Sequence, residues 1–234
     1  MKNTIKKIIS NKWILRSLLH TIYFNFKYLP LKQAVKLPIL LYKPRLLKLA
    51  GSIKIEAENI HFGMIQLGRN IVSFYPNSGI TIENEGNIIF KGISKICSGG
   101  CLSVKRNANL TIGNNFTATA ELKLACHFSI TICENVLIGW ATKIFDTDFH
   151  KLTYLDQNEH KKPFGSINIG RNVWIANDCL IMKNTVIPDN CVVGARSTMM
   201  KKYDIPSYSL IAGSPATFIK TGCWLNRNDM QIEY

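Results

Sequence analysis

A six-residue repeat in the C-terminal half constrains the fold of this chain more than any other feature. Aliphatic residues stand six apart without a break, and a second series of mostly small residues follows four positions behind. Six is neither the period of a helix nor that of a two-sided strand, and a short fixed period is typical of a solenoid. We predict one short strand and one corner per hexad, with these side chains inside: Ile169, Ile175, Ile181, Ile187, Val193 and Met199, followed by Val173, Cys179, Thr185, Cys191 and Ser197.

The same period recurs earlier in the chain in other phases. Ile132, Ile138 and Ile144 form one run, and residues 112–124 form a weaker one. Residues 51–110 favour short strands separated by glycines, which is typical of irregular early coils. The interval 145–167 contains no hexad, so we expect it to project from the solenoid as a long loop, and such loops usually carry function.

Residues 1–50 differ from the rest of the chain. They hold eleven Lys and Arg and no acidic residue, which leaves 18 cations against 15 acids, a net charge of +3, for the other 184 residues. The nearly balanced body disfavours a nucleic-acid binder. An apolar stripe at helical spacing predicts a basic amphipathic helical segment over residues 1–50: Ile5, Ile8, Ile9, Leu15, Leu19, Ile22 and Phe26.

Two roles remain open for the first 28 residues. The apolar stripe either packs on the open end of the solenoid as a cap or contacts an anionic membrane. The segment has no apolar run long enough to span a bilayer and no secretory pattern. Seven cysteines without metal-binding spacing favour free thiols. We expect a cytoplasmic protein, in peripheral contact with the inner membrane if the second role holds.

Several motifs resemble one family of enzymes. The run Ile169–Ala176 continues through Val193–Ser197 and Lys202–Pro206 to Ala212–Ala216. This order resembles the hexapeptide-repeat acyltransferases, in particular the galactoside and maltose acetyltransferases and the O-acetyltransferases of surface polysaccharides. The resemblance implies an all-β fold, a left-handed parallel β-helix over residues 51–219, between the helical segment and a tail over 220–234. It also implies acetyl-CoA as co-substrate and a homotrimer, because the sites of the family lie between subunits. Ala176, Arg196 and Met199-Met200 depart from the usual pattern.

A sugar hydroxyl needs a base before it attacks a thioester, and histidine is the usual choice. Among five histidines, His150 lies at the start of the long loop, in a context that resembles the catalytic histidine of the family. Asp146 and Asp148 either orient this imidazole or cap backbone amides at the turn. His127 either faces the acceptor or is an edge histidine whose backbone partners satisfy it.

The resemblance also implies where coenzyme and acceptor bind. It places backbone contacts with pantetheine at Asn177 and Ala195, and Trp174 near the site. Lys201 and Lys220 match positions of cations near the coenzyme phosphates, although each is otherwise a solvated surface charge. Trp140 either forms a wall of the acceptor pocket or covers the end of the coil.

Metal chemistry is disfavoured by the histidine spacing. The γ-class carbonic anhydrases resemble this fold and bind zinc through three histidines, whereas His150 and His160 lie in a loop without repeats. We therefore expect no metal and no nucleic acid. The predicted activity is acetyl-CoA-dependent O-acetylation of a sugar in a bacterial surface polysaccharide or its precursor, with His150 as general base. The alternatives are N-acetylation of an amino-sugar nucleotide and a catalytically silent membrane-associated solenoid.

Overall fold

The computed structural model describes residues 17–153, 155 and 161–226 and consists mainly of three parallel β-sheets. We call them sheets A, B and C, in the order in which the chain first enters them. Sheet A holds β1 (Ile39–Leu41), β4 (Ile65–Leu67), β7 (Ser94–Ile96), β10 (Phe116–Ala118), β13 (Leu137–Ile138), β16 (Trp174–Ile175), β19 (Val192–Val193), β21 (Ser209–Gly213) and β22 (Ala216–Thr221). Sheet B holds β2 (Pro44–Leu49), β5 (Ile80–Asn84), β8 (Gly100–Val104), β11 (Lys123–Cys126), β14 (Lys143–Phe145), β17 (Leu180–Met182) and β20 (Thr198–Met199). Sheet C holds β3 (Ser52–Ile55), β6 (Asn87–Phe90), β9 (Asn109–Ile112), β12 (Ser129–Ile132), β15 (Ile167–Ile169) and β18 (Val186–Ile187).

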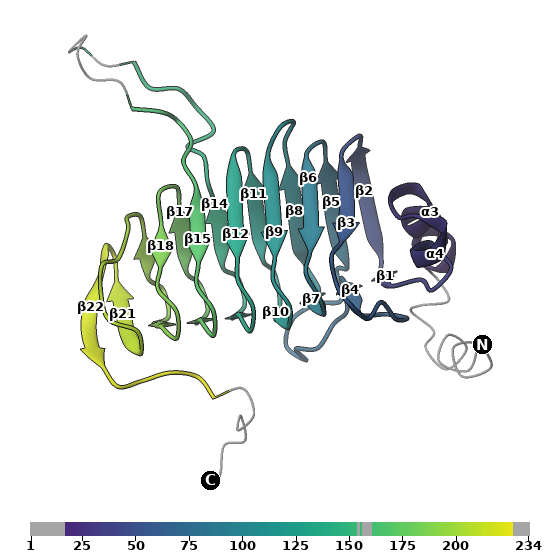
Figure 1. Ribbon diagram of the computed structural model, residues 1–234. Helices are drawn as coiled ribbons and strands as arrows, with labels where there is room; N and C mark the ends of the chain where they lie inside the picture. The colour runs from purple at the N-terminus through teal and green to yellow at the C-terminus, as the bar shows by residue number, and fades with distance from the viewer. Residues whose placement is uncertain (1–16, 154, 156–160, 227–234) are drawn as a thin grey trace.

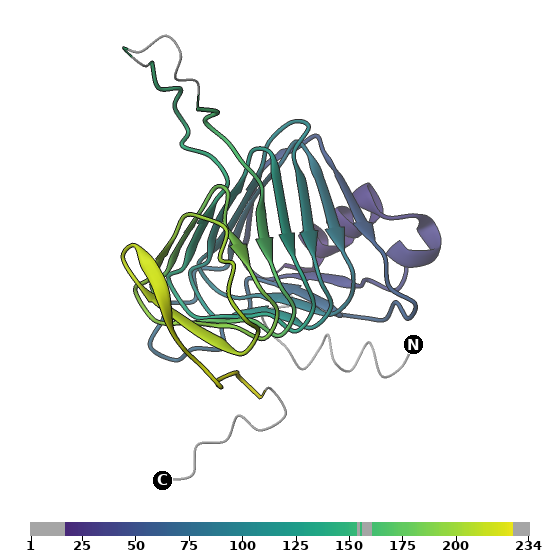
Figure 2. The same ribbon diagram turned by 60° about the vertical axis from the view of Figure 1, so that its left-hand side comes forward.

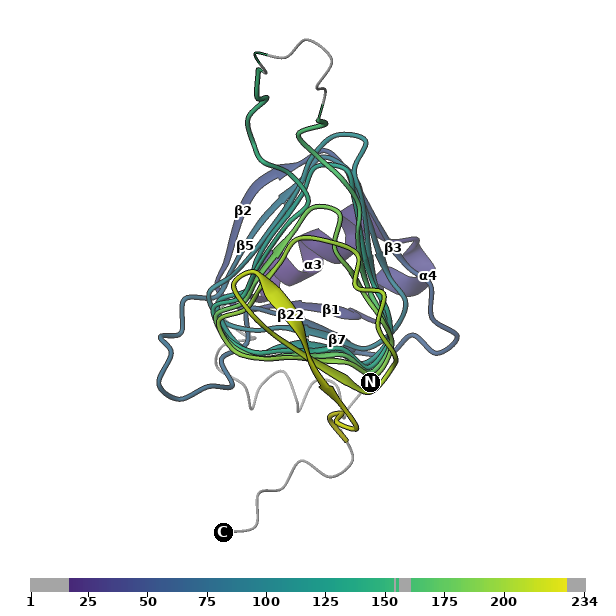
Figure 3. The same ribbon diagram turned by 90° about the vertical axis from the view of Figure 1, so that its left-hand side faces the viewer.

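The three sheets form the sides of a triangular prism (Figures 1 and 3). Each coil runs through sheets A, B and C in turn, so the prism has an A–B corner, a B–C corner and a C–A corner. The loop over residues 68–79 leaves the A–B corner, and the loop over residues 146–166 leaves the B–C corner. Residues that follow equivalent strands of successive coils therefore line up along one corner, so a site on a corner can combine side chains from several coils.

The register confirms the hexad prediction. Ile169 pairs with Ile187 in sheet C, Ile175 with Val193 in sheet A, and Ile181 with Met199 in sheet B. Three hexads therefore make one coil. All six side chains lie in the core, as do the residues four positions behind them: Val173, Cys179, Thr185, Cys191 and Ser197.

A residue with positive φ turns the chain at each corner of this region. These residues also stand six apart, and asparagine is the most frequent among them, because its short side chain tolerates the left-handed conformation. Arg196 takes this conformation with φ 56°, at a position that favours Gly or Asn. The departure from the family pattern at Arg196 therefore leaves the turn unchanged. The set is Asn172, Asp178, Asn184, Asn190 and Arg196.

Helix α3 (Leu18–Tyr28), followed by the short α4 (Leu31–Ala34), covers the N-terminal end of the prism. Polar side chains of α3 accept hydrogen bonds from the backbone amides at the open edge of β1. Asn25 Oδ1 accepts from the amide of Ile39 at 3.1 Å, and Thr21 Oγ1 accepts from the amide of Leu41 at 3.1 Å. Four residues of helix and two of strand both advance by roughly 6 to 7 Å, so the two series stay in step.

The cap interpretation was therefore wrong in one respect. Within the described residues, the predicted apolar stripe faces away from the solenoid, since Leu19, Ile22 and Phe26 are exposed and Phe24 is buried instead. A strand edge has unpaired amides, and polar side chains bind them where an apolar stripe cannot. The stripe residues 5, 8, 9 and 15 lie outside the described part of the chain.

Both predicted boundaries of the β-helix are displaced. Strands β1 and β2 lie inside the segment that we expected to be helical, so the solenoid begins at Ile39. At the other end, β21 and β22 form an antiparallel hairpin, in which β22 passes the predicted end at residue 219 (Figure 2). Among the described residues, no helix is long and apolar enough to cross a membrane.

Candidate active site

The long loop leaves the B–C corner through a narrow neck. Thr147 and Phe164 form an antiparallel bridge, and the amide of Asp148 donates to the carbonyl oxygen of Pro163 at 2.7 Å. Lys183, on the next coil, binds the Asp148 carboxylate and donates to the carbonyl oxygen of Lys162 at 2.8 Å. These contacts fix the backbone immediately before His150.

Both predicted orienting carboxylates have other partners. Asp146 is fully buried, and its two oxygens accept from the amides of His127 at 2.7 Å and Phe128 at 2.9 Å. Asp148 is engaged by Lys183. Within the described residues, neither carboxylate hydrogen-bonds to His150. Asp146 therefore acts as a cap for the preceding coil, which is one of the two roles that the sequence left open.

The two histidines of this corner are connected through Phe149, which contacts His127 and directly precedes His150. His150 is exposed and directly follows Phe149, whose backbone has φ 62°. The Phe149 ring meets the His127 ring edge to face, with 5.4 Å between centroids. Partial burial lowers the pKa of His127, and the nearby Asp146 carboxylate opposes this shift. The site thus places His127, whose pKa is lowered, beside the root of the loop, and His150 further along the loop.

Trp140, Asn177 and Ala195 lie along the A–B corner on three successive coils. The amide of Arg196 donates to the carbonyl oxygen of Asn177 at 3.0 Å, and the amide of Asp178 donates to that of Trp140 at 2.9 Å. Within the described chain, the backbone N–H groups of Asn177 and Ala195 make no hydrogen bond. Two free amides on adjacent coils fit an extended ligand that carries its own amide carbonyls, as pantetheine does.

The remaining predicted coenzyme residues are spread over the molecule. Trp174 lies on the outer face of sheet A, half-buried between the C–A and A–B corners. Lys220 is exposed on β22, and Lys201 is exposed after β20, with its ammonium 5.6 Å from the centroid of the Tyr203 ring. A strand of sheet B separates His150 from the A–B corner. One chain alone therefore does not bring His150 to Asn177 and Ala195.

The loop over residues 68–79 also reaches the A–B corner, and the sequence analysis missed it. Phe74 and Tyr75 contact Trp140, with centroid separations of 5.2 and 6.3 Å. The signal was present as an interruption between two apolar runs that holds two aromatic residues and Pro76.

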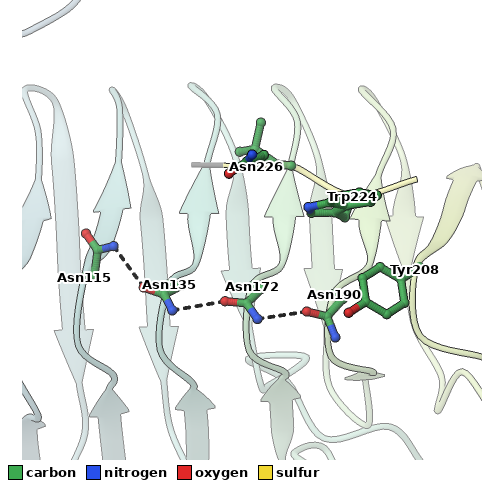
Figure 4. A pocket seen from close by; sticks show the side chains of 8 residues that line it. Asn115, Asn135, Asn172, Asn190, Tyr208, Trp224 and Asn226 are labelled. Carbon is green, nitrogen blue, oxygen red and sulfur yellow. Dashed lines mark hydrogen bonds between the residues drawn. The ribbon is translucent and has the colours of Figure 1, made fainter. Parts of the chain in front are cut away.

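A ladder of asparagines follows the C–A corner (Figure 4). Each amide nitrogen donates to the amide oxygen on the next coil, at 2.9, 3.0 and 2.8 Å in turn. Together with Tyr208 and Trp224, the ladder lines a groove of about 640 Å³. The recurring pattern of Asn before an apolar residue could have revealed it. The ladder consists of Asn115, Asn135, Asn172 and Asn190.

The four buried cysteines do not supply an activated nucleophile. Cys126, Cys179 and Cys191 are buried, and burial raises the pKa of each thiol above its ordinary value. Burial raises the pKa of Cys97 to about 11. A thiol with a raised pKa is a poor nucleophile at neutral pH. In the part of the chain that the structure describes, no group of three His, Cys, Asp or Glu side chains is placed to hold a metal.

A triangular β-helix with hexad coils, a histidine loop and a corner of free backbone amides is the arrangement that the resemblance to the hexapeptide-repeat acyltransferases implies. Comparison with known proteins agrees. The chain is 35% identical over 113 residues to the galactoside O-acetyltransferase of Escherichia coli K12, which covers 48% of this chain and 54% of that protein. It is 28% identical over 180 residues to the putative lipopolysaccharide biosynthesis O-acetyl transferase WbbJ of the same organism, over 68% of this chain and 88% of WbbJ.

Among solved structures, the polySia-specific acetyltransferase NeuO superposes with a TM-score of 0.61 at 19% identity, over 83% of this chain and 81% of that one. This likeness concerns the fold, and it confirms the predicted left-handed parallel β-helix. The resemblance to the hexapeptide-repeat acyltransferases is confirmed by these homologues. The match to the galactoside enzyme spans about half of its length. No family model matches the chain.

Proposed function

We propose that this protein is an acetyl-CoA-dependent O-acetyltransferase that acts on a sugar hydroxyl of a bacterial surface polysaccharide or its precursor. The sequence predicts this activity, and it agrees with the names of the relatives, which include an O-acetyltransferase of galactosides and a putative one of lipopolysaccharide biosynthesis. The observation that supports it most is the pair of free amides at Asn177 and Ala195. They lie on the corner to which the motifs assign the coenzyme.

His150 acts as the general base in this proposal. When bound, acetyl-CoA supplies an activated acyl carbon. The His150 imidazole takes the proton of the sugar hydroxyl while the hydroxyl oxygen bonds to that carbon, and a free corner amide stabilises the oxyanion. The C–S bond then breaks, and the imidazolium returns its proton to the leaving thiolate. Asp148 and Lys183 hold the neck of the loop, and Asp146 fixes the adjoining coil as its cap, so these residues position the general base.

A panel assay tests the activity. Acetyl-CoA consumption is measured against hexoses, their methyl glycosides and amino-sugar nucleotides, for the wild type, His150→Ala and the control His61→Ala. His61 is exposed on another corner. Transfer that His150→Ala alone abolishes, with a product that hydroxylamine cleaves, supports O-transfer. A hydroxylamine-resistant product indicates N-transfer, and no transfer to any acceptor indicates a silent solenoid.

We further propose a homotrimer in which one subunit's loop meets the next subunit's A–B corner. The separation of His150 from Asn177 within one chain supports this arrangement. Complementation tests it, because chains with His150→Ala and chains with Ala195→Trp are inactive alone. Mixed trimers regain a fraction of wild-type activity if each site draws on two chains. An inactive mixture of stable trimers contradicts a shared site.

We also propose that helices α3 and α4 contact an anionic membrane, where lipid-linked sugars are assembled. Leu19 is 81% exposed, Leu31 67% and Val35 60%, and Lys27 and Lys32 lie beside them. Each such cation contributes about 1 kcal/mol near an anionic surface. This contact would make the cytoplasmic protein peripheral to the inner membrane.

Point substitutions test this contact without removing the cap. The double variant Leu19→Ser/Leu31→Ser leaves Thr21 and Asn25 in place. We expect the wild type and the control Leu47→Ser, an exposed leucine on sheet B, to sediment with phosphatidylglycerol vesicles but not with phosphatidylcholine vesicles. The double variant should stay in solution with both. Equal sedimentation of all three proteins contradicts the proposed surface.

A further inference from the structure

The loop over residues 68–79 is an ordered element. Asn70 organises it, because its amide nitrogen donates to the carbonyl oxygen of Tyr75 at 3.1 Å and its amide oxygen accepts from the amide of Val72 at 3.3 Å. Ser98, which is buried, donates to the carbonyl oxygen of Pro76 at 2.8 Å and accepts from the amide of Ser78 at 2.7 Å. The tip of the loop is therefore held at both sides.

This order presents aromatic rings along the A–B corner. The loop starts after β4, yet Phe74 meets Trp140, which follows β13, three coils further along sheet A. The Phe74 and Trp140 rings are edge to face at 89°, and Tyr75 lies 5.3 Å from Phe74. Phe74 remains 68% exposed. A large aromatic side chain that is fixed in place and still exposed is suited to contact a ligand.

Polar groups surround this cluster. Burial, followed by the charges of the Glu121 and Asp178 carboxylates, raises the pKa of Tyr75. Asn177 donates to Asp178 Oδ2 at 2.6 Å, and the free amide of Asn177 lies on the same corner. Apolar rings with a few convergent polar groups are typical of small-molecule sites.

We propose that Phe74, Tyr75 and Trp140 form the wall against which the pyranose ring of the acceptor stacks, so that the loop over residues 68–79 selects the acceptor. This inference rests on the proposed function. A pyranose has a face of C–H groups that gains from burial on an aromatic surface, and hydroxyls on its rim that carboxylates and amides can bind. The wall lies on the corner of the free amides, so a stacked sugar is held next to the acyl group.

Steady-state kinetics of Phe74→Ala test the wall, with the best methyl hexoside of the panel as acceptor. We expect the KM for the sugar to rise about 5- to 10-fold, which corresponds to about 1 to 1.4 kcal/mol. The KM for acetyl-CoA should change less than about 2-fold, because the coenzyme contacts are elsewhere on the corner. Phe74→Tyr should restore the sugar KM, since it keeps the ring.

The matched control is Trp224→Ala, which also removes an exposed ring from an edge-to-face pair, with Tyr208 at 5.7 Å on the C–A corner. It should leave both KM values unchanged. An unchanged sugar KM in Phe74→Ala overturns the inference while the wild-type activity upholds the proposed function. Dissociation of the Phe74→Ala trimer in size-exclusion chromatography also overturns it, because the rings would then form a subunit interface. Absence of transfer in the wild type refutes the proposed function and the wall with it.

Discussion

The C–A and A–B corners of this prism turn the backbone in the same way, but their polar groups differ in whether they have partners within the chain. On the C–A corner, the amides of four asparagines bind one another from coil to coil. On the A–B corner, the backbone amides of Asn177 and Ala195 have no hydrogen-bond partner among the described residues, and Phe74 is largely exposed. Paired groups stabilise the coil, whereas groups without partners in the chain are available to a ligand. A groove of about 640 Å³ lies over the ladder, whereas the ligand contacts that we propose are on the other corner.

The B–C corner has both kinds of group, since Asp146 is paired and His150 is exposed. The largest predicted effect is on turnover at this corner. His150 is exposed and lies beyond the neck, so His150→Ala should leave the melting temperature unchanged. It should lower kcat by about 10² to 10⁴, the range for a lost general base. Parallel measurements of kcat and thermal unfolding check this. If the variant keeps its turnover, His150 is not the general base. An exposed side chain without a partner would then be a poorer indicator of function in this fold.

Asp146→Ala should have the opposite signature. It removes a fully buried carboxylate and leaves the amides of His127 and Phe128 without their acceptor. Each unsatisfied buried donor costs about 1 to 3 kcal/mol, so for the two donors we expect a loss of about 2 to 6 kcal/mol in the free energy of unfolding. Urea denaturation measures it. The control Asp148→Ala breaks a partly exposed ion pair and should cost less than about 1 kcal/mol.

Kinetics separate this capping role from a direct role in the triad. At a temperature where Asp146→Ala remains folded, a positioning residue changes kcat modestly and leaves its pH profile in place. A shift of the pH profile towards a different base pKa would show that Asp146 acts on the His150 imidazole after all.

The ladder allows a smaller test of the paired corner. Asn172 has φ 54° and takes part in two ladder bonds. Asn172→Ala loses both bonds and strains the left-handed turn, at a cost of about 2 kcal/mol or more. Asn172→Gly keeps the turn and should cost about 1 kcal/mol. Neither substitution should alter the KM for the sugar or for acetyl-CoA, and a change in either would make the groove over the ladder a ligand site.

The sequence predicted the elements that depend on periodicity. The hexad of Ile169 to Met199 determines the strand spacing, the buried face and the coil length, because each property repeats every six residues. The interval 145–167, which contains no hexad, also marked the projecting loop correctly. Periodicity carries no information about the interruptions, so the contact between Phe74 and Trp140 across three coils was not predictable. The cap was misread because Thr21 and Asn25 look like poor packing residues, although an open strand edge requires them.

The smallest predicted effect is on stability and concerns the pair Glu83–Lys105 on the outer face of sheet B. It tests whether an ion pair that is not buried stabilises this fold. Glu83 accepts from Lys105 at 2.8 Å and from Ser103 at 2.7 Å, and these hydrogen bonds lower the pKa of its carboxyl group. Because the folded pKa is the lower one, the pair stabilises the protein at pH values above the unfolded pKa. This contribution disappears as the pH falls through the folded pKa.

Glu83→Gln should therefore destabilise the protein at pH 7 by less than about 1 kcal/mol, as is usual for a solvent-accessible pair. The difference from the wild type should shrink steadily below about pH 4, where the unfolded carboxyl group takes up its proton. Urea midpoints of both proteins from pH 7 down to the onset of acid unfolding measure this trend. A loss at pH 7 as large as that of Asp146→Ala would contradict the distinction between buried and exposed pairing, because the Asp146 carboxylate is fully buried whereas that of Glu83 is partly exposed.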